Sequence, residues 1–158
     1  MNSKDQVYVN LQKHLDNQAV GFPATRSGVE IKILKHIFTP QEAEITSYLS
    51  YKLEPLKAIF DRVGHLLESP EELEKLLDGI QKKGGIESKI KNGIKHYCCA
   101  PFVIGMYEFQ LGRLTPEFIK DFNELRLIKW ITVSIIKLYN ELTIGRIEDD
   151  VRGLWGRS

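Results

Sequence analysis

The stretch that decides the fold is SPEELEKLLDGIQKKGGIESKIKNGIKHYCCAP, residues 69–101. It opens with Ser69, a proline and two glutamates, which is the capping-box pattern of a helix start. Apolar residues then recur at helical spacing and predict a helix from Ser69 to Lys83, ended by two glycines: Leu73, Leu76, Leu77 and Ile80. After the glycines, Asn92-Gly93 separates two apolar runs and predicts a β-hairpin. Its first arm is residues 86–90, and its second arm begins at Ile94 and ends before Pro101.

The residues just before this stretch predict one more helix, from Glu54 to Val63, ended by Gly64. Helix, short connection, helix and hairpin is the order of a winged helix-turn-helix domain. In that architecture the helix from Ser69 takes the recognition position, and Ile86 to Phe102 forms the wing. We therefore expect a mainly α fold with a small β-hairpin wing.

The remaining segments predict further helices. Val7, Leu11 and Leu15 indicate a helix over residues 5–17, Ser27 is expected to cap a second, and Thr39-Pro40-Gln41-Glu42 opens a third. Residues 102–109 predict a helix or a buried connector, and Thr115 caps a helix that continues through Phe122. We expect a winged-helix domain over residues 1–122 and a C-terminal helical extension over residues 123–158.

The segment Leu125 to Leu142 is apolar on several faces, and its β-branched residues keep a strand open as well as a helix. If exposed, it would form a partner or homodimer surface; otherwise it folds back on the domain. Its run from Leu127 contains Lys129 and Lys137 and is too short to span a membrane, so no membrane association is expected.

Composition excludes several classes of protein. The 158 residues carry 22 basic and 21 acidic side chains, a net charge of +1, which gives no support to a polyanion binder as a whole. The two cysteines, Cys98 and Cys99, are adjacent and imply no disulfide framework. The first residues show no signal-peptide pattern. A cytoplasmic protein is expected.

Charge is distributed unevenly around the predicted wing. Residues 69–79 hold four acids and one base, a net −3, whereas residues 81–97 hold five lysines and one glutamate, a net +4. Base readout and phosphate contact both need cations or amides, so the acidic helix argues against a DNA reader. A basic hairpin could still contact phosphates through Lys82, Lys83, Lys89, Lys91 and Lys95. The competing interpretation is that these lysines protect a strand edge.

The sequence contains little that indicates a metal site or a catalytic site. On a strand, His96 and Cys98 share a face and Cys99 points the other way, but two ligands make no structural zinc site. We expect one buried cysteine and one partly exposed. The four histidines, His14, His36, His65 and His96, fall on different elements, and no catalytic motif is present. We expect no catalytic residue, no bound metal and no enzyme activity.

Two phrases together carry a family resemblance. One runs from Gly21-Phe22-Pro23-Ala24-Thr25 to Phe38-Thr39-Pro40-Gln41-Glu42-Ala43, and the other is residues 101–110. Over residues 7–122 the chain resembles the N-terminal, winged-helix-like region of certain 4Fe-4S ferredoxin-type dicluster proteins. It departs from them in lacking the cysteine runs that hold the clusters, so no cluster ligand can be transferred.

The resemblance implies a non-catalytic interaction or regulatory module of a 4Fe-4S ferredoxin-type redox protein. Its partner would be another protein or a cluster domain, with 4Fe-4S clusters only in a downstream domain and no cofactor in this chain. The alternative is a winged-helix transcriptional regulator that binds DNA through the basic hairpin.

Overall fold

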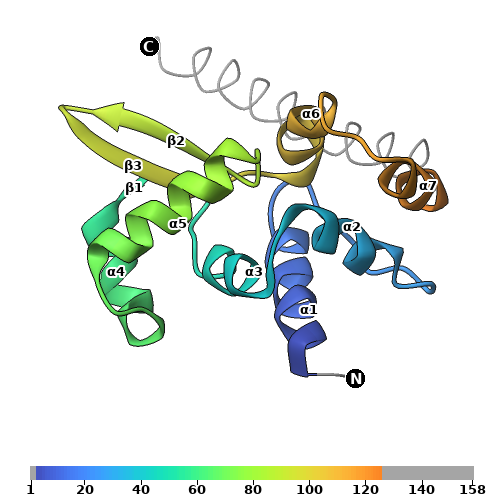
Figure 1. Ribbon diagram of the computed structural model, residues 1–158, viewed down its shortest axis with the longest axis horizontal. Helices are drawn as coiled ribbons and strands as arrows, with labels where there is room; N and C mark the ends of the chain where they lie inside the picture. Colours follow the sequence, from blue (N-terminus) through green and yellow to red (C-terminus); the bar gives the residue numbers. More distant parts are fainter. Residues whose placement is uncertain (1–2, 126–158) are drawn as a thin grey trace, which may run out of the picture.

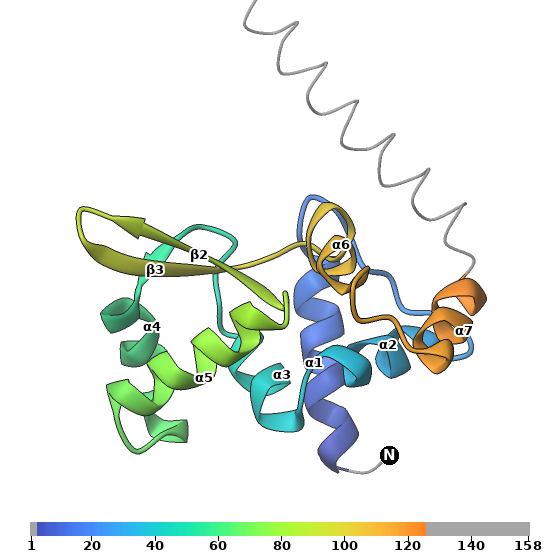
Figure 2. The same cartoon turned by 45° about the horizontal axis from the view of Figure 1, so that its top comes forward.

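The computed structural model describes residues 3–125, which form seven α-helices and one three-stranded antiparallel sheet (Figure 1). The chain is therefore mainly helical with a small sheet, as the sequence predicts. Helices α1–α3 and α7 gather at one end, and α4, α5 and the sheet lie at the other, from which the hairpin projects (Figure 2). The α-helices are α1 Ser3–Asp16, α2 Val29–Ile37, α3 Pro40–Thr46, α4 Leu56–Val63, α5 Pro70–Lys82, α6 Tyr107–Gln110 and α7 Pro116–Glu124.

Of the three N-terminal helices, α3 begins at its predicted cap, α1 begins two residues before the predicted Asp5, and α2 has a different cap. Thr39 forms a complete capping box with Glu42 at the start of α3. Ser27, however, does not cap α2. The N-cap is Gly28, with φ of 69° and no side-chain cap, while the Thr25 hydroxyl donates to the Glu30 carboxylate at 2.5 Å. The left-handed turn at Gly28 moves the helix start one residue beyond Ser27.

The hairpin is confirmed, and its first arm is one residue longer than the sequence predicts. Strands β2 (Ile86–Lys91) and β3 (Ile94–Cys99) pair from Ile86–Cys99 to Lys91–Ile94. Asn92 and Gly93 have φ of 51° and 76°, the positive values that a type I′ turn requires. The second arm ends at Cys99, before Pro101, as the sequence predicts, because Pro101 supplies no N–H, and a π-helix begins at Phe102.

The prediction of a helix beginning at Glu54 is wrong in its first two residues. Glu54–Pro55 is strand β1, which pairs with Tyr97 and His96 and gives the sheet order β1-β3-β2. A residue before proline disfavours helical angles, so Glu54 stays extended and Pro55 becomes the N-cap. Arg62 on α4 then donates to both oxygens of the Glu54 carboxylate, at 2.8 and 2.5 Å.

Helix α5 begins and ends where the sequence predicts, with one difference in its cap. The Ser69 hydroxyl accepts from the Glu72 N–H, but the Glu72 carboxylate accepts from the Glu68 N–H, so the capping box is only half formed. At the other end Gly84 has φ of 77°, and a Cβ there would lie 2.2 Å from the Cβ of Phe109. Only glycine satisfies both conditions.

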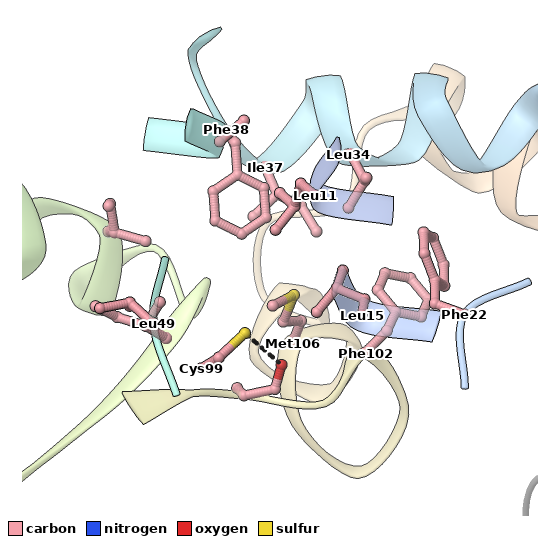
Figure 3. Close-up of a cluster of buried hydrophobic side chains, with 14 of the residues drawn as sticks. Leu11, Leu15, Phe22, Leu34, Ile37, Phe38, Leu49, Cys99, Phe102 and Met106 are labelled. Atoms are coloured by element: carbon pink, nitrogen blue, oxygen red, sulfur yellow. Dashed lines mark hydrogen bonds between the residues drawn. The ribbon is translucent and has the colours of Figure 1, made fainter. Parts of the chain in front are cut away.

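One hydrophobic core joins the two ends of the molecule (Figure 3). Leu11 and Leu15 of α1 pack with residues from α2 and the connection after β3, and the rings of Phe22 and Phe102 lie 4.5 Å apart. The segment after β3 is a π-helix, Phe102–Met106, followed by α6, which matches the predicted helix or buried connector. The N-terminal helices and the sheet therefore form one packed body.

Helix α7 closes the described chain against α2. Thr115 caps it as predicted, and the Asp121 carboxylate accepts a hydrogen bond of 2.8 Å from the His36 ring. The helix runs to Glu124, two residues past the expected domain boundary at residue 122. The rest of the expected extension, and with it nearly all of the Leu125 to Leu142 segment, lies outside the described residues.

Candidate functional site

The five lysines of the predicted basic wing occupy three separate places. Lys82 and Lys83 end α5, while the strand alternation puts Lys89 and Lys91 on one face of the hairpin and Lys95 on the other. The sequence predicts a single basic hairpin because these five lysines lie close together along the chain. The structure does not bring them together as one basic face.

Two of the five lysines are already paired with acids. The Lys83 ammonium lies 2.5 Å from the buried Glu42 carboxylate, and the Lys95 ammonium forms an ion pair with Asp78. Lys82, Lys89 and Lys91 are exposed, and within residues 3–125 no ion pair joins them. Only these three lysines keep an unpaired charge for a ligand.

Asp78 is the polar link between α5 and the hairpin. Besides Lys95, it accepts a hydrogen bond of 2.8 Å from the hydroxyl of Tyr97, a fully buried residue. Burial alone would raise the pKa of Asp78, but the hydrogen bonds from Lys95 and Tyr97 outweigh it and lower that pKa. Burial, and then Asp78 itself, raise the pKa of Tyr97. The cluster is built for one ionised carboxylate and one neutral phenol.

The outward face of α5 forms a shallow groove of about 500 Å³. Its N-terminal part is acidic, and the groove is lined by Glu71, Glu74, Lys75, Asp78, Gly79 and Lys82. Gly79 lies within the helix, and a Cβ built on it would meet nothing within 4 Å. This glycine is not required by the packing around it, and it leaves backbone open at the middle of the groove.

Two isoleucines near the hairpin turn are exposed. Ile90 is 70% exposed and sits directly across the hairpin from Lys95, whose ammonium contacts Asp78 in the groove. Ile94, 57% exposed, lies on the other face of the hairpin, next to the turn. The sequence predicts both as strand residues, but not their exposure, which follows from the way the hairpin tip projects from the body of the molecule (Figure 1).

The cysteines and histidines do not assemble a reactive centre. Both cysteines are buried, which corrects the expectation that one is partly exposed: Cys98 packs on the outer face at 6% exposure and Cys99 in the core at 2%. Burial raises the pKa of Cys98, and it raises the pKa of Cys99 to about 12. Both thiols are therefore neutral and weakly reactive near neutral pH.

The four histidines have four different surroundings. His14 contacts the Leu49 carbonyl, His36 contacts Asp121, His65 meets the ring of Tyr48, and His96 contacts the Ile94 carbonyl. Within residues 3–125, no three side chains of His, Cys, Asp or Glu are grouped so that they could hold a metal ion. The described part of the chain also contains no helix with the length and apolar character needed to cross a bilayer.

With this geometry established, comparison with protein-family models, with curated proteins and with solved structures gives no match.

Proposed function

We propose that this chain is a non-catalytic protein-interaction module of the winged-helix type. The order β1, α4, α5, β2, β3, with β1 paired beside β3, supports this architecture. In it α5 takes the recognition position and the β2–β3 hairpin is the wing. The expected helix-helix-hairpin order, on which the sequence argument rests, is present.

The observation that carries the proposal is the surface made by α5 and the wing. Three carboxylates of α5 line the groove against two lysines, and one of the carboxylates is paired with Lys95. Ile90, directly across the hairpin from Lys95, adds exposed apolar area on the wing. An apolar residue beside charged groups is the composition of a protein contact. The open backbone at Gly79 lets a partner approach α5 closely.

The same surface fits DNA poorly. A helix in the major groove lies among phosphates, which repel carboxylates such as those of Glu71 and Glu74. Asp78 already occupies Lys95, and Lys89 and Lys91 point to the other face of the hairpin. The DNA-binding regulator therefore stays the second candidate, supported only by the three unpaired lysines.

The partner class comes from the resemblance to ferredoxin-type proteins. We infer a protein that carries 4Fe-4S clusters, or a cluster domain, which this module would dock or orient in the cytoplasm. No cluster ligand is assigned to this chain, and its role is confined to the contact.

Site-specific photo-crosslinking in cells tests the proposal. A photoreactive phenylalanine derivative replaces Lys75 in the groove or Ile90 on the wing, and Lys120 on α7 serves as the exposed control. The proposal expects a protein adduct at 75 and 90 and none at 120. Nucleic-acid adducts at these two positions, or equal adducts at all three, would overturn it. Iron in the adducted protein would support the redox partner.

A further inference from the structure

A cavity of about 480 Å³ lies at the base of the hairpin, apart from the α5 groove. Its volume falls in the range of small-molecule sites, roughly 300–1,000 Å³. Its walls are mostly apolar and come from the turn after α1, the loop before β1 and the ends of β2 and β3: Asn17, Gln18, Ala19, Val20, Tyr51, Glu87, Cys98, Cys99 and Pro101.

The cavity is held open by packed and hydrogen-bonded backbone. Glu87 and Cys98 are direct cross-strand partners, so they project side by side from one face of the sheet. The N–H of Cys99 donates to the Ser50 carbonyl at 2.8 Å, which fixes the loop carrying Tyr51 to the end of β3. These contacts place a carboxylate and an aromatic ring along one cavity.

Glu87 is the charged side chain among the residues that line the cavity. No ion pair neutralises Glu87 in the part of the chain that the structure describes. After burial, Glu87 is the larger electrostatic influence on the Cys98 thiol, exceeding the opposite effect of Lys91. Tyr51 is 68% exposed, and the Lys52 ammonium lies 5.7 Å from its ring centroid, so this ring attracts a cation. A ligand ammonium would have to take the place of Lys52 at this ring.

We propose that this cavity binds a small apolar molecule that carries a protonated amine. The ammonium would lie between the Glu87 carboxylate and the Tyr51 ring, and the apolar body would cover Val20, Cys98 and Pro101. A carboxylate and an aromatic face are the groups that hold ammonium ions in proteins. This site is independent of the partner surface on α5.

The cavity lining also contains a polar atom that the fold leaves without a full partner. The amide nitrogen of Gln18 is buried and has no hydrogen-bond acceptor at full geometry within residues 3–125. Its side chain lies beside the Cys99 thiol, where it partly offsets the effect of burial on that pKa, and a thiol is a weak acceptor. A ligand that shifts the Gln18 side chain would therefore break no strong hydrogen bond.

Three matched probes test the proposal on the full chain: 4-phenylbutylamine, the neutral 4-phenylbutan-1-ol and the anionic 4-phenylbutyrate. In a titration followed by ¹H–¹⁵N NMR, we expect the amine to bind best and to move the amide signals of Ala19, Val20, Cys98 and Cys99. Glu87→Gln should weaken amine binding about tenfold, to the level of the alcohol. Glu74→Gln, in the α5 groove, should leave it unchanged.

A second variant tests the location of the binding site without changing any charge. Ala19 is exposed at the cavity wall, so Ala19→Trp should fold and should block the amine and the alcohol alike. Equal binding of all three probes, no effect of Glu87→Gln, signals that move elsewhere, or no binding at millimolar probe would each overturn the proposal.

Discussion

Asp78 of α5 forms an ion pair with Lys95 of β3 and, through the same oxygen, accepts a hydrogen bond from the hydroxyl of Tyr97. One carboxylate thus joins the helix to the hairpin and removes a lysine from the basic surface that the sequence suggests. The Asp78–Lys95 ion pair therefore both holds the hairpin to α5 and weakens the hypothesis that the hairpin binds DNA.

Replacing Asp78 should therefore change how stability depends on pH. The lowered pKa means that ionised Asp78 stabilises the fold above the ordinary aspartate pKa, and this contribution is lost as pH falls through the lowered value. Asp78→Asn should lower the free energy of unfolding by about 1 kcal/mol near neutral pH, since the pair is part-exposed. On acidification, the variant should lose less of its stability than the wild type does. Urea unfolding at a series of pH values measures both effects.

The control for this experiment is Asp61→Asn, which breaks an exposed pair with Lys57 on α4 and should be close to neutral. Parallel acid profiles for wild type and Asp78→Asn would show that Asp78 does not carry the pH dependence.

Gly79→Ala should stabilise the protein by about 0.5–1 kcal/mol. The added Cβ meets no atom within 4 Å, and alanine favours a helix interior over glycine. Gly84→Ala is the matched opposite, because φ is positive there and Phe109 occupies the space. Urea midpoints of the two variants should move in opposite directions. A loss of stability in Gly79→Ala would mean that α5 needs glycine for its own packing.

Duplex DNA should not bind the chain at low salt, as fluorescence anisotropy with a labelled duplex would show. If it did bind, Lys89→Glu with Lys91→Glu should abolish most of the signal, because these side chains would contact phosphates. Asp78→Asn should then strengthen binding by releasing Lys95. Steeply salt-dependent binding by the wild type would favour the regulator over the interaction module.

The buried thiols should make the fold sensitive to alkali. With a pKa raised to about 12, Cys99 contributes stability below the ordinary thiol pKa, and this contribution disappears as pH rises through the folded value. Unfolding experiments between pH 8 and 11 should show falling stability. The free energy of unfolding of Cys99→Ala should be about 1–2 kcal/mol lower at the start and should fall less as pH rises. Some fall should remain, because the raised pKa of Tyr97 acts in the same direction. An unchanged alkaline slope in Cys99→Ala would contradict this account.

Local signals predicted most of the described secondary structure, because each has a local physical cause. The cap residues Thr39, Ser69 and Thr115 and the Asn92-Gly93 turn all act within a few residues of themselves. Strand β1 was not predicted, because two residues are too few to show a periodic pattern. It is a strand only because it pairs with β3, which is distant in sequence. The charge pairing at the candidate site could not be predicted from the sequence, since pairs such as Lys83–Glu42 join residues far apart in the chain.

The Asn92-Gly93 turn also restricts how this hairpin can change in length. Because side chains alternate along both strands, one inserted residue before β3 would exchange its two faces, turning Tyr97 towards solvent and His96 towards α5. A two-residue insertion in each arm would keep every face in place. The tip can therefore grow in even steps without disturbing Asp78, and an engineer could lengthen the wing only by that rule.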